Sequence, residues 1–180
     1  MQEFLATNII FDALLLLAPI AFIYFFEKRR PRQIDFGLVK ASPIDDAILA
    51  GKIFLAILIY SMLISFALYS LGVNDFAGVE NAIRAVAQTN MLALAYLMVF
   101  RVFAEEFFFR AFLVPRIGIL GSSILFGLLH LGYGSVSEII GAILLGGILA
   151  ISYKQYGRIL PNFLAHFLYN FVALAVIFGG

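Results

Sequence analysis

Apolar runs long enough to cross a lipid bilayer constrain this chain more than any other feature of its sequence. The first run extends from Phe4 to Phe26 and is interrupted only by Asn8 and Asp12. A helix of about 20 apolar residues spans the hydrocarbon core. Hydrophobic residues make up 63% of the 180 residues and charged residues 13%, against roughly 45–50% and about 25% in soluble domains. We therefore expect an all-α polytopic membrane helix bundle, because helices satisfy their own backbone groups in lipid.

The apolar pattern predicts about six transmembrane helices in two parts of the chain. The expected helices cover residues 4–26, 47–71, 90–114, 118–131, 136–153 and 159–178. Residues 1–89 are expected to form an N-terminal two-helix membrane segment, with a basic linker at residues 27–46. Residues 90–180 are expected to form a helical core from the last four helices.

Two connections between these helices are less regular. Residues 72–89 are expected to form a mildly polar loop with one basic residue, Arg84. Pro115 is expected to end the third helix, because proline cannot continue a helix without losing a backbone hydrogen bond. Gly118 and Gly121 then allow a turn into the fourth helix.

Alternating six helices across a bilayer gathers the basic residues on one side. If the linker 27–46 is cytoplasmic, ten of the twelve lysines and arginines lie in or next to cytoplasmic connections. These are Lys28, Arg29, Arg30, Arg32, Lys40, Lys52, Arg110, Arg116, Lys154 and Arg158. The positive-inside rule therefore predicts that both termini lie outside. The formal net charge of +1 gives no indication of a nucleic-acid partner.

The third expected helix carries three charges in otherwise apolar sequence. Inserting a charged side chain into lipid costs at least about 2.5 kcal/mol, so each of these charges is expected to have a structural or functional role. Glu106 and Arg110 are four residues apart, share a helix face and are expected to form an ion pair. Glu105 points about 100° away from that face, as follows from 3.6 residues per turn, and stays available. Arg101, one turn earlier, and Asp12 of the first helix are expected to make polar contacts inside the bundle.

Two later helices bring further polar groups to the same depth. His130 ends the fourth helix, four residues after Phe126, and His166 and Asn170 share a face of the sixth helix. With a rise of 1.5 Å per residue, Glu105, His130, His166 and Asn170 lie about 12–18 Å from the predicted cytoplasmic surface. Each has a structural explanation of its own, as an anchor, a cap or an interhelical hydrogen bond. Their common depth favours one shared site, reached from the cytoplasmic side.

These side chains suit the hydrolysis of an amide by water. A carboxylate and an imidazole that face each other activate a water molecule, one orienting it and the other taking its proton. A second histidine with an asparagine amide supplies donors for a developing oxyanion. The chain has no cysteine, which excludes a cysteine nucleophile and thiolate metal sites. It also has no H-E-x-x-H, no G-x-S-G and no G-x-G-D sequence, which argues against the common zinc, serine and aspartyl membrane proteases.

Three motifs give the chain a resemblance to a known family. E-E-F-F-F-R at Glu105–Arg110, F-G-L-L-H at Phe126–His130 and H-F-L-Y-N at His166–Asn170 are similar in order and spacing to EExxxR, FxxxH and HxxxN of the CPBP/ABI family. That family contains the Rce1-like CAAX prenyl proteases and bacteriocin-processing proteins. The resemblance covers roughly residues 90–178.

The resemblance implies a glutamate-dependent intramembrane endopeptidase in which the last four helices are the catalytic core. Glu105 and His130 would activate water, and His166 and Asn170 would form the oxyanion hole. The supporting residues of the motifs are Glu106, Arg110 and Phe126. No cofactor is implied. The expected substrate is a membrane-embedded or lipid-modified peptide, cut near the cytoplasmic face of what we expect to be a prokaryotic cell membrane.

Three alternatives to this function stay open from the sequence. The first is a metal-dependent protease with Glu105, His130 and His166 as ligands, because two histidines and a carboxylate are a suitable zinc set. A non-catalytic bacteriocin immunity or scaffold protein is the second alternative. A proton-coupled transporter is the third, although the sequence lacks the repeated interrupted helices of that class. The sequence gives no oligomeric state.

Overall fold

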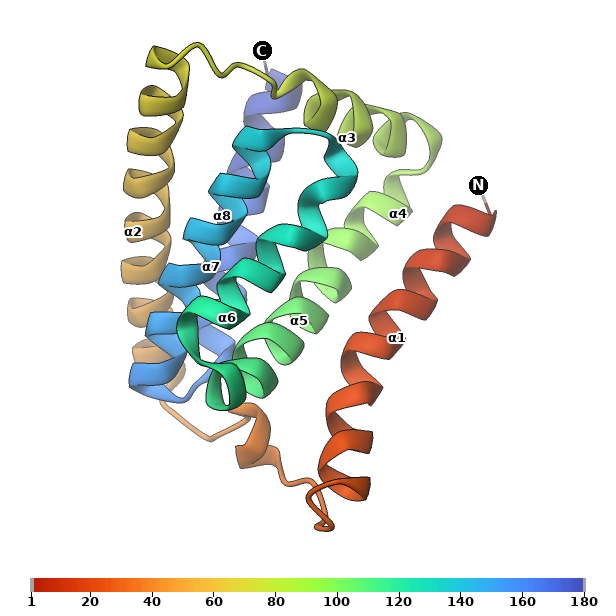
Figure 1. Cartoon of the computed structure of the whole chain (residues 1–180), viewed down its shortest axis with the longest axis vertical. Coiled ribbons are helices and arrows are strands. Elements are labelled where there is room, and N and C mark those ends of the chain that lie inside the picture. Colours follow the sequence, from red (N-terminus) through yellow and green to blue (C-terminus); the bar gives the residue numbers. More distant parts are fainter. Residues whose placement is uncertain (1, 180) are drawn as a thin grey trace.

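Helices are the only regular elements in residues 2–179, the residues that this computed structural model describes (Figure 1). They are α1 (Gln2–Phe25), η1 (Gln33–Phe36), α2 (Pro43–Ser70), α3 (Ala77–Thr89), α4 (Met91–Tyr96), η2 (Leu97–Arg101), α5 (Val102–Glu105), η3 (Glu106–Leu113), α6 (Val114–Leu128), η4 (Leu129–Tyr133), α7 (Val136–Tyr156) and α8 (Ile159–Gly179). η1 and η4 are 3₁₀ helices, whereas η2 and η3 have the wider π-helical turn. The predicted all-α polytopic bundle is confirmed.

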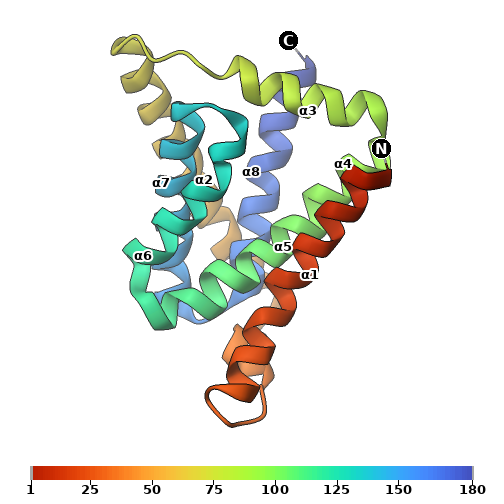
Figure 2. The ribbon, with the colours of Figure 1, turned by 45° about the vertical axis from the view of Figure 1, so that its right-hand side comes forward.

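Five helical runs in the described residues are long and apolar enough to cross a membrane. Four of them lie in α1, α2, α7 and α8, close to the predicted bounds. The remaining run extends over 43 residues, from Met91 to Tyr133, and contains both helices predicted at 90–114 and 118–131. The chain reverses within this run, so that α6 returns alongside η3 (Figures 1 and 2). The six predicted segments are therefore present as five runs, one of which folds back on itself.

The reversal occurs at Gly118, and the prediction that Pro115 ends the third helix was wrong. Pro115 lies in the first turn of α6, where the N–H that proline lacks would have no helical partner. Gly118 has φ 77° and ψ 179°, a conformation that glycine adopts without the steric cost of a Cβ. The helical path thus continues past the proline and breaks at the glycine.

Residues 72–89 are not the loop that the sequence predicted, because most of them form the helix α3. Apolar Val79, Ile83 and Val86 recur at helical spacing and face the interior of the protein. Glu80 and Arg84 pair one turn apart, with Nε to Oε1 at 2.8 Å. Arg84 also donates to the carbonyl of Ile177 near the end of α8. α3 therefore crosses one end of the bundle (Figure 2), and its low average hydropathy concealed an amphipathic helix.

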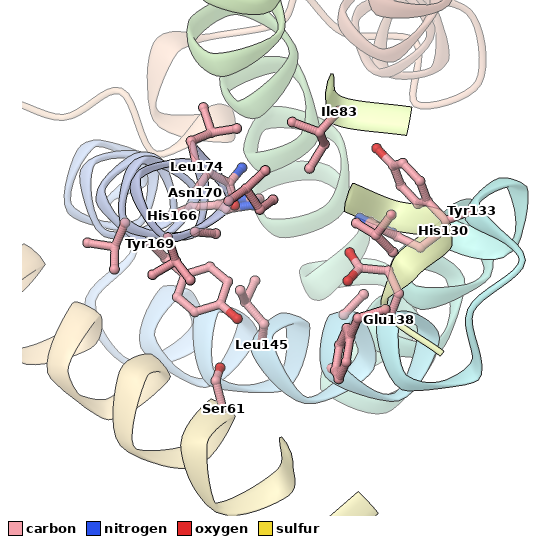
Figure 3. A pocket seen from close by; sticks show the side chains of 18 of the residues that line it. Ser61, Ile83, His130, Tyr133, Glu138, Leu145, His166, Tyr169, Asn170 and Leu174 are labelled. Atoms are coloured by element: carbon pink, nitrogen blue, oxygen red, sulfur yellow. The ribbon is translucent and has the colours of Figure 1, made fainter. Parts of the chain in front are cut away.

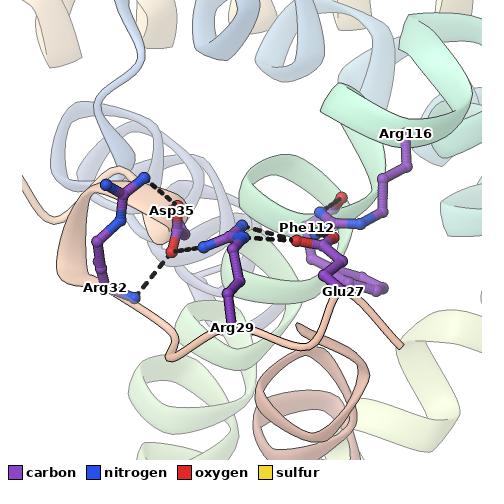
Figure 4. A network of polar contacts seen from close by, with 6 residues as sticks. All are labelled: Glu27, Arg29, Arg32, Asp35, Phe112 and Arg116. Carbon is purple, nitrogen blue, oxygen red and sulfur yellow. Dashed lines mark hydrogen bonds and ion pairs between the residues drawn. The ribbon is translucent and has the colours of Figure 1, made fainter. Parts of the chain in front are cut away.

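The opposite end of the bundle gathers the linker and two helix connections, and we call residues 26–42, 115–121 and 154–158 the basic end. The backbone N–H of Ile159 donates to the carbonyl of Gly37 at 3.1 Å, which joins the start of α8 to the linker. Figure 4 shows the ion pairs that join the linker to the α6 turn; they involve Glu27, Arg29, Arg32, Asp35 and Arg116. Hydrogen bonds from Arg116 and Arg29 lower the pKa of Glu27. The predicted alternation of the connections is therefore observed.

α1 is attached to the bundle by a polar contact between its middle and η2. Asp12 is buried, forms an ion pair with Arg101 and accepts a hydrogen bond from the Tyr96 hydroxyl at 2.7 Å. Arg101 also donates to the side-chain oxygen of Asn8 at 2.8 Å. The predicted internal contacts of Asp12 and Arg101 are confirmed, and they are made to each other.

Close packing of α6 on α7 depends on glycine at position 127. A Cβ on Gly127 would lie 2.2 Å from Cγ1 of Ile143 and 3.0 Å from the carbonyl oxygen of Ile139. We expect Gly127→Ala to lower the free energy of unfolding by about 1–3 kcal/mol, the usual cost of overpacking. Gly51→Ala is the control, since a Cβ there meets no atom within 4 Å. Thermal unfolding in detergent would show the difference, and equal melting temperatures would contradict this account of the packing.

The orientation of the bundle can be tested with single cysteines, because the chain has none of its own. Arg30 lies at the basic end and Asn74 in the connection before α3, and both are exposed. The excess of positive charge predicts that Asn74→Cys reacts with a membrane-impermeant maleimide on intact cells. Arg30→Cys should react only after the cells are opened. The reverse pattern of labelling would invert the predicted orientation.

Candidate functional site

A cavity of about 1090 Å³ lies among α2, α3, α7, α8 and the 91–133 run, and its wall is mainly apolar (Figure 3). The four residues that the sequence proposed as catalytic all line it: Glu105, His130, His166 and Asn170. They come from three segments that are distant in sequence, namely α5, η4 and α8. The cavity is therefore the place where a shared chemistry of these groups would occur.

Glu105 and Glu106 are adjacent in the chain but have different surroundings. Glu105 is the last residue of α5, lines the cavity and makes no hydrogen bond or ion pair to any described residue. Glu106 begins the π-helical η3 and is completely buried. Single π-helical turns inside α-helices are frequent at functional sites. Here the change of helical type occurs between the two carboxylates.

The buried Glu106 connects two helices through its two carboxylate oxygens. Oε2 lies 3.4 Å from Nε of Arg110, which is also completely buried, so the predicted ion pair is observed. Oε1 lies 2.9 Å from Nδ1 of His166 on α8. The sequence analysis missed this second contact, because a contact between residues 60 positions apart leaves no mark in local spacing.

Phe126 lies at the centre of the site and contacts three of the motif residues. Its ring centre is 4.1 Å from the guanidinium carbon of Arg110, close enough for a cation–π contact. The ring centres of His130 and His166 lie 4.9 and 5.8 Å from that of Phe126. The aromatic ring thus packs against Arg110 and against both imidazoles, and it helps to set the position of the two histidines.

Hydrogen bonding determines which ring nitrogens are left for the cavity. Nδ1 of His130 lies 2.9 Å from the carbonyl oxygen of Phe126. A carbonyl only accepts, so Nδ1 carries the proton and Nε2 is the nitrogen available to a ligand. Nδ1 of His166 is occupied by Glu106, which likewise leaves Nε2. Asn170 has no hydrogen bond to another described residue, and its amide is turned toward the cavity (Figure 3).

The cavity extends from these groups toward α3, whereas the sequence predicted access from the cytoplasmic, basic end. Its described lining includes Val79 and Ile83 of α3 and Ile177 of α8, and none of it comes from the basic end. Towards the basic end the interior is filled by buried side chains such as Arg110 and Phe109. Depths counted along the sequence give the distance of each residue from a helix end, but they do not show which end of the cavity is closed by packed side chains.

Two further polar residues of the site were missed by the sequence analysis. Asn162 is completely buried and donates to the carbonyl of Leu149 on α7 at 2.7 Å. It lies four residues before His166, so the helical stripe of His166 and Asn170 extends one turn further than was recognised. Glu138 of α7 also lines the cavity, and the sequence analysis did not single it out.

Possible metal ligands do not cluster in the described residues. No group of three or more histidine, aspartate and glutamate side chains there has the proximity needed to hold a metal ion. This applies also to Glu105, His130 and His166, which the sequence analysis considered as possible zinc ligands. These three residues share the cavity without forming a coordination sphere.

Comparison with known families identifies the part of the chain that carries this site. Residues 87–172 match the family model of the type II CAAX prenyl endopeptidases, Rce1-like. This segment is Rce1-like. It contains all three motifs and extends from the last residues of α3 into α8. No curated protein matches the chain, and no solved structure matches it.

The five apolar helical runs indicate an integral membrane protein, and its residues 87–172 are similar to a family of peptidases. The resemblance read from the three motifs is thus confirmed over the matched segment. The N-terminal part, with α1, α2 and nearly all of α3, lies outside the match. It contributes residues of α2 and α3 to the cavity wall nevertheless.

The buried ion pair of the Rce1-like segment is expected to behave as one unit. Glu106→Gln and Arg110→Met should each lower the free energy of unfolding by about 3–5 kcal/mol, because each leaves a buried charge without its partner. The double variant should lose much less than the sum of the two. Unfolding of the purified protein in mixed detergent micelles would measure this coupling. Additive losses would show that the two charges are stabilised separately.

Proposed function

We propose that the protein is an intramembrane endopeptidase that hydrolyses a peptide bond with an activated water molecule. One observation carries this proposal: four polar groups with spare hydrogen-bonding capacity face a single cavity within the membrane. These groups are the carboxylate of Glu105, Nε2 of His130, Nε2 of His166 and the amide of Asn170. The match to a peptidase family supports the same conclusion.

In the proposed reaction Glu105 and His130 handle the water. The free Nε2 of His130 accepts a hydrogen bond from the water and orients it, while Glu105 takes its proton. The water oxygen then attacks the carbonyl carbon of the substrate. When the C–N bond breaks, Glu105 returns the proton to the leaving nitrogen, so that protons balance over the cycle. The lack of an ion-pair partner leaves Glu105 available for both steps.

His166 and Asn170 are proposed to stabilise the tetrahedral intermediate. They are four residues apart on one face of α8, so both can donate to one oxyanion. The contact of Nδ1 with the carboxylate of Glu106 fixes the ring of His166 with Nε2 toward the cavity, and the proposed oxyanion contact is made from Nε2. Glu106 is therefore a positioning residue, which acts through His166.

The substrate is proposed to be a membrane-embedded or lipid-modified peptide. A mainly apolar cavity of about 1090 Å³ accommodates an extended apolar peptide segment or a lipid chain together with the bond to be cut. The cavity extends from the reacting groups toward α3. Substrate would thus be cut below the α3 end, and not next to the basic end as the sequence suggested.

Removal of the Glu105 carboxylate tests the proposal. Glu105→Gln should lower the rate of cleavage by about 10²–10⁴-fold, the usual contribution of a general base, and leave folded protein in the membrane. The measurement compares the termini of membrane proteins in cells that carry the wild type, Glu105→Gln or Asp45→Asn. Asp45 is an exposed acid in the first turn of α2, remote from the cavity, and serves as the control.

The expected result is a new terminus with the wild type and Asp45→Asn that is missing with Glu105→Gln. Unchanged processing by Glu105→Gln would reject the mechanism. Loss of processing after treatment with a chelator would instead favour the metal-dependent alternative. If no terminus depends on the protein while a biological effect persists in Glu105→Gln, a non-catalytic immunity or scaffold protein would be favoured.

A further inference from the structure

Glu138 is a second carboxylate in the cavity wall that the proposed mechanism does not use. It lies in the first turn of α7 and lines the cavity. Figure 3 shows its carboxylate turned toward the open centre, in the corner that also holds His130 and Tyr133. The carboxylate makes no hydrogen bond or ion pair to any described residue. Acids inside membrane proteins usually face a functional cavity and have a partner.

The ordinary task of an acid at a helix start is already performed by another residue. Asp75, in the connection before α3, accepts hydrogen bonds from the N–H of Val136 at 2.5 Å, the N–H of Ser137 at 3.2 Å and the hydroxyl of Ser135 at 3.0 Å. The hydrogen bonds from Ser137, Val136 and Ser135 lower the pKa of Asp75 to about 2. The N-terminus of α7 therefore has its negative charge, and Glu138 is not needed for capping.

The other charges of the cavity wall are matched within the protein. Arg101 is paired with Asp12, and Arg84 is paired with Glu80. Only two acids of the described wall have no cation, Glu105 and Glu138. The proposed mechanism assigns Glu105 to the activation of water. Glu138 is therefore the remaining acid of the described wall that has no cation and could bind a positively charged group of a ligand.

We infer that Glu138 forms an acidic subsite that binds a positively charged side chain, lysine or arginine, of the peptide substrate. This rests on the proposed function for the peptide nature of the ligand. A cation placed there makes a charge-assisted hydrogen bond to the carboxylate. The ring of Tyr133, on the same side of the cavity (Figure 3), offers an aromatic face that also favours a cation. The subsite adjoins His130 and thus lies next to the reacting bond.

The test uses binding, so that it does not depend on cleavage. The full chain carrying Glu105→Gln is reconstituted in lipid nanodiscs and titrated with fluorescent apolar peptides. Each peptide contains one lysine, glutamine or glutamate, and this residue is placed in turn at every position. Glu138→Gln and Glu138→Lys are added to this background. Glu80→Gln is the matched control, because Glu80 is an acid of the same wall that already has a partner.

At one peptide position we expect lysine to bind about tenfold more tightly than glutamine, the scale of a charge-assisted hydrogen bond. Glu138→Gln should abolish this preference, Glu138→Lys should reverse it toward glutamate, and Glu80→Gln should leave it unchanged. Size-exclusion chromatography shows whether each variant is folded. Equal binding of the three peptides at every position, or a lysine preference that survives in Glu138→Gln, would overturn the subsite.

Cleavage of the same peptides by the chain with Glu105 intact separates the two proposals. Cleavage without any dependence on charge would reject the subsite and leave the peptidase. Binding that depends on Glu138, with no peptide ever cut, would support the subsite and reject the peptidase mechanism.

Discussion

The rest of the structure depends on the ion pair between Glu106 and Arg110, because neither charge has access to solvent. Both side chains are completely buried, and lipid offers no alternative partner. The pair fixes the face that η3 turns inward. From it, Glu106 reaches His166 on α8, and Arg110 lies over the ring of Phe126 on α6. Three segments of the chain are thus connected by two charges that must stay together.

The same pair explains how adjacent glutamates acquire different properties. In a helix, neighbouring residues point in directions about 100° apart, so Glu105 and Glu106 cannot both face Arg110. Glu106 uses its two carboxylate oxygens in contacts with Arg110 and His166. Glu105 lies on the cavity side and forms no ion pair with any described residue. The ring of Phe126 packs against Arg110 and against both imidazoles of the site. The proposed mechanism accordingly gives the proton transfer to Glu105, because its neighbour Glu106 makes the polar contacts to Arg110 and His166.

Features that depend on length and local spacing were predictable from the sequence. The apolar runs gave four spans to within a few residues, and the four-residue spacing gave the pair of Glu106 with Arg110. Features that depend on contacts distant in sequence were not predictable, such as the contact of Glu106 with His166. The helix α3 was missed because its average hydropathy was judged without its period. The third helix was expected to end at Pro115, but proline is tolerated in the first turn of a helix, and the chain turns at Gly118, one of the two glycines expected to allow it.

The direction of the cavity and its chemistry follow from one further constraint. Hydrolysis near mid-bilayer needs water there, and a purely apolar cavity would stay dry. A buried water is held when it has two to four polar partners, and the groups of Glu105, His130, His166 and Asn170 converge from three segments to provide them. Packed side chains fill the interior toward the basic end, and the cavity extends toward α3. The groups proposed to break the peptide bond are also polar groups of the wall that can hydrogen-bond a water molecule, so replacing one of them is expected to change both the chemistry and the hydration of the cavity.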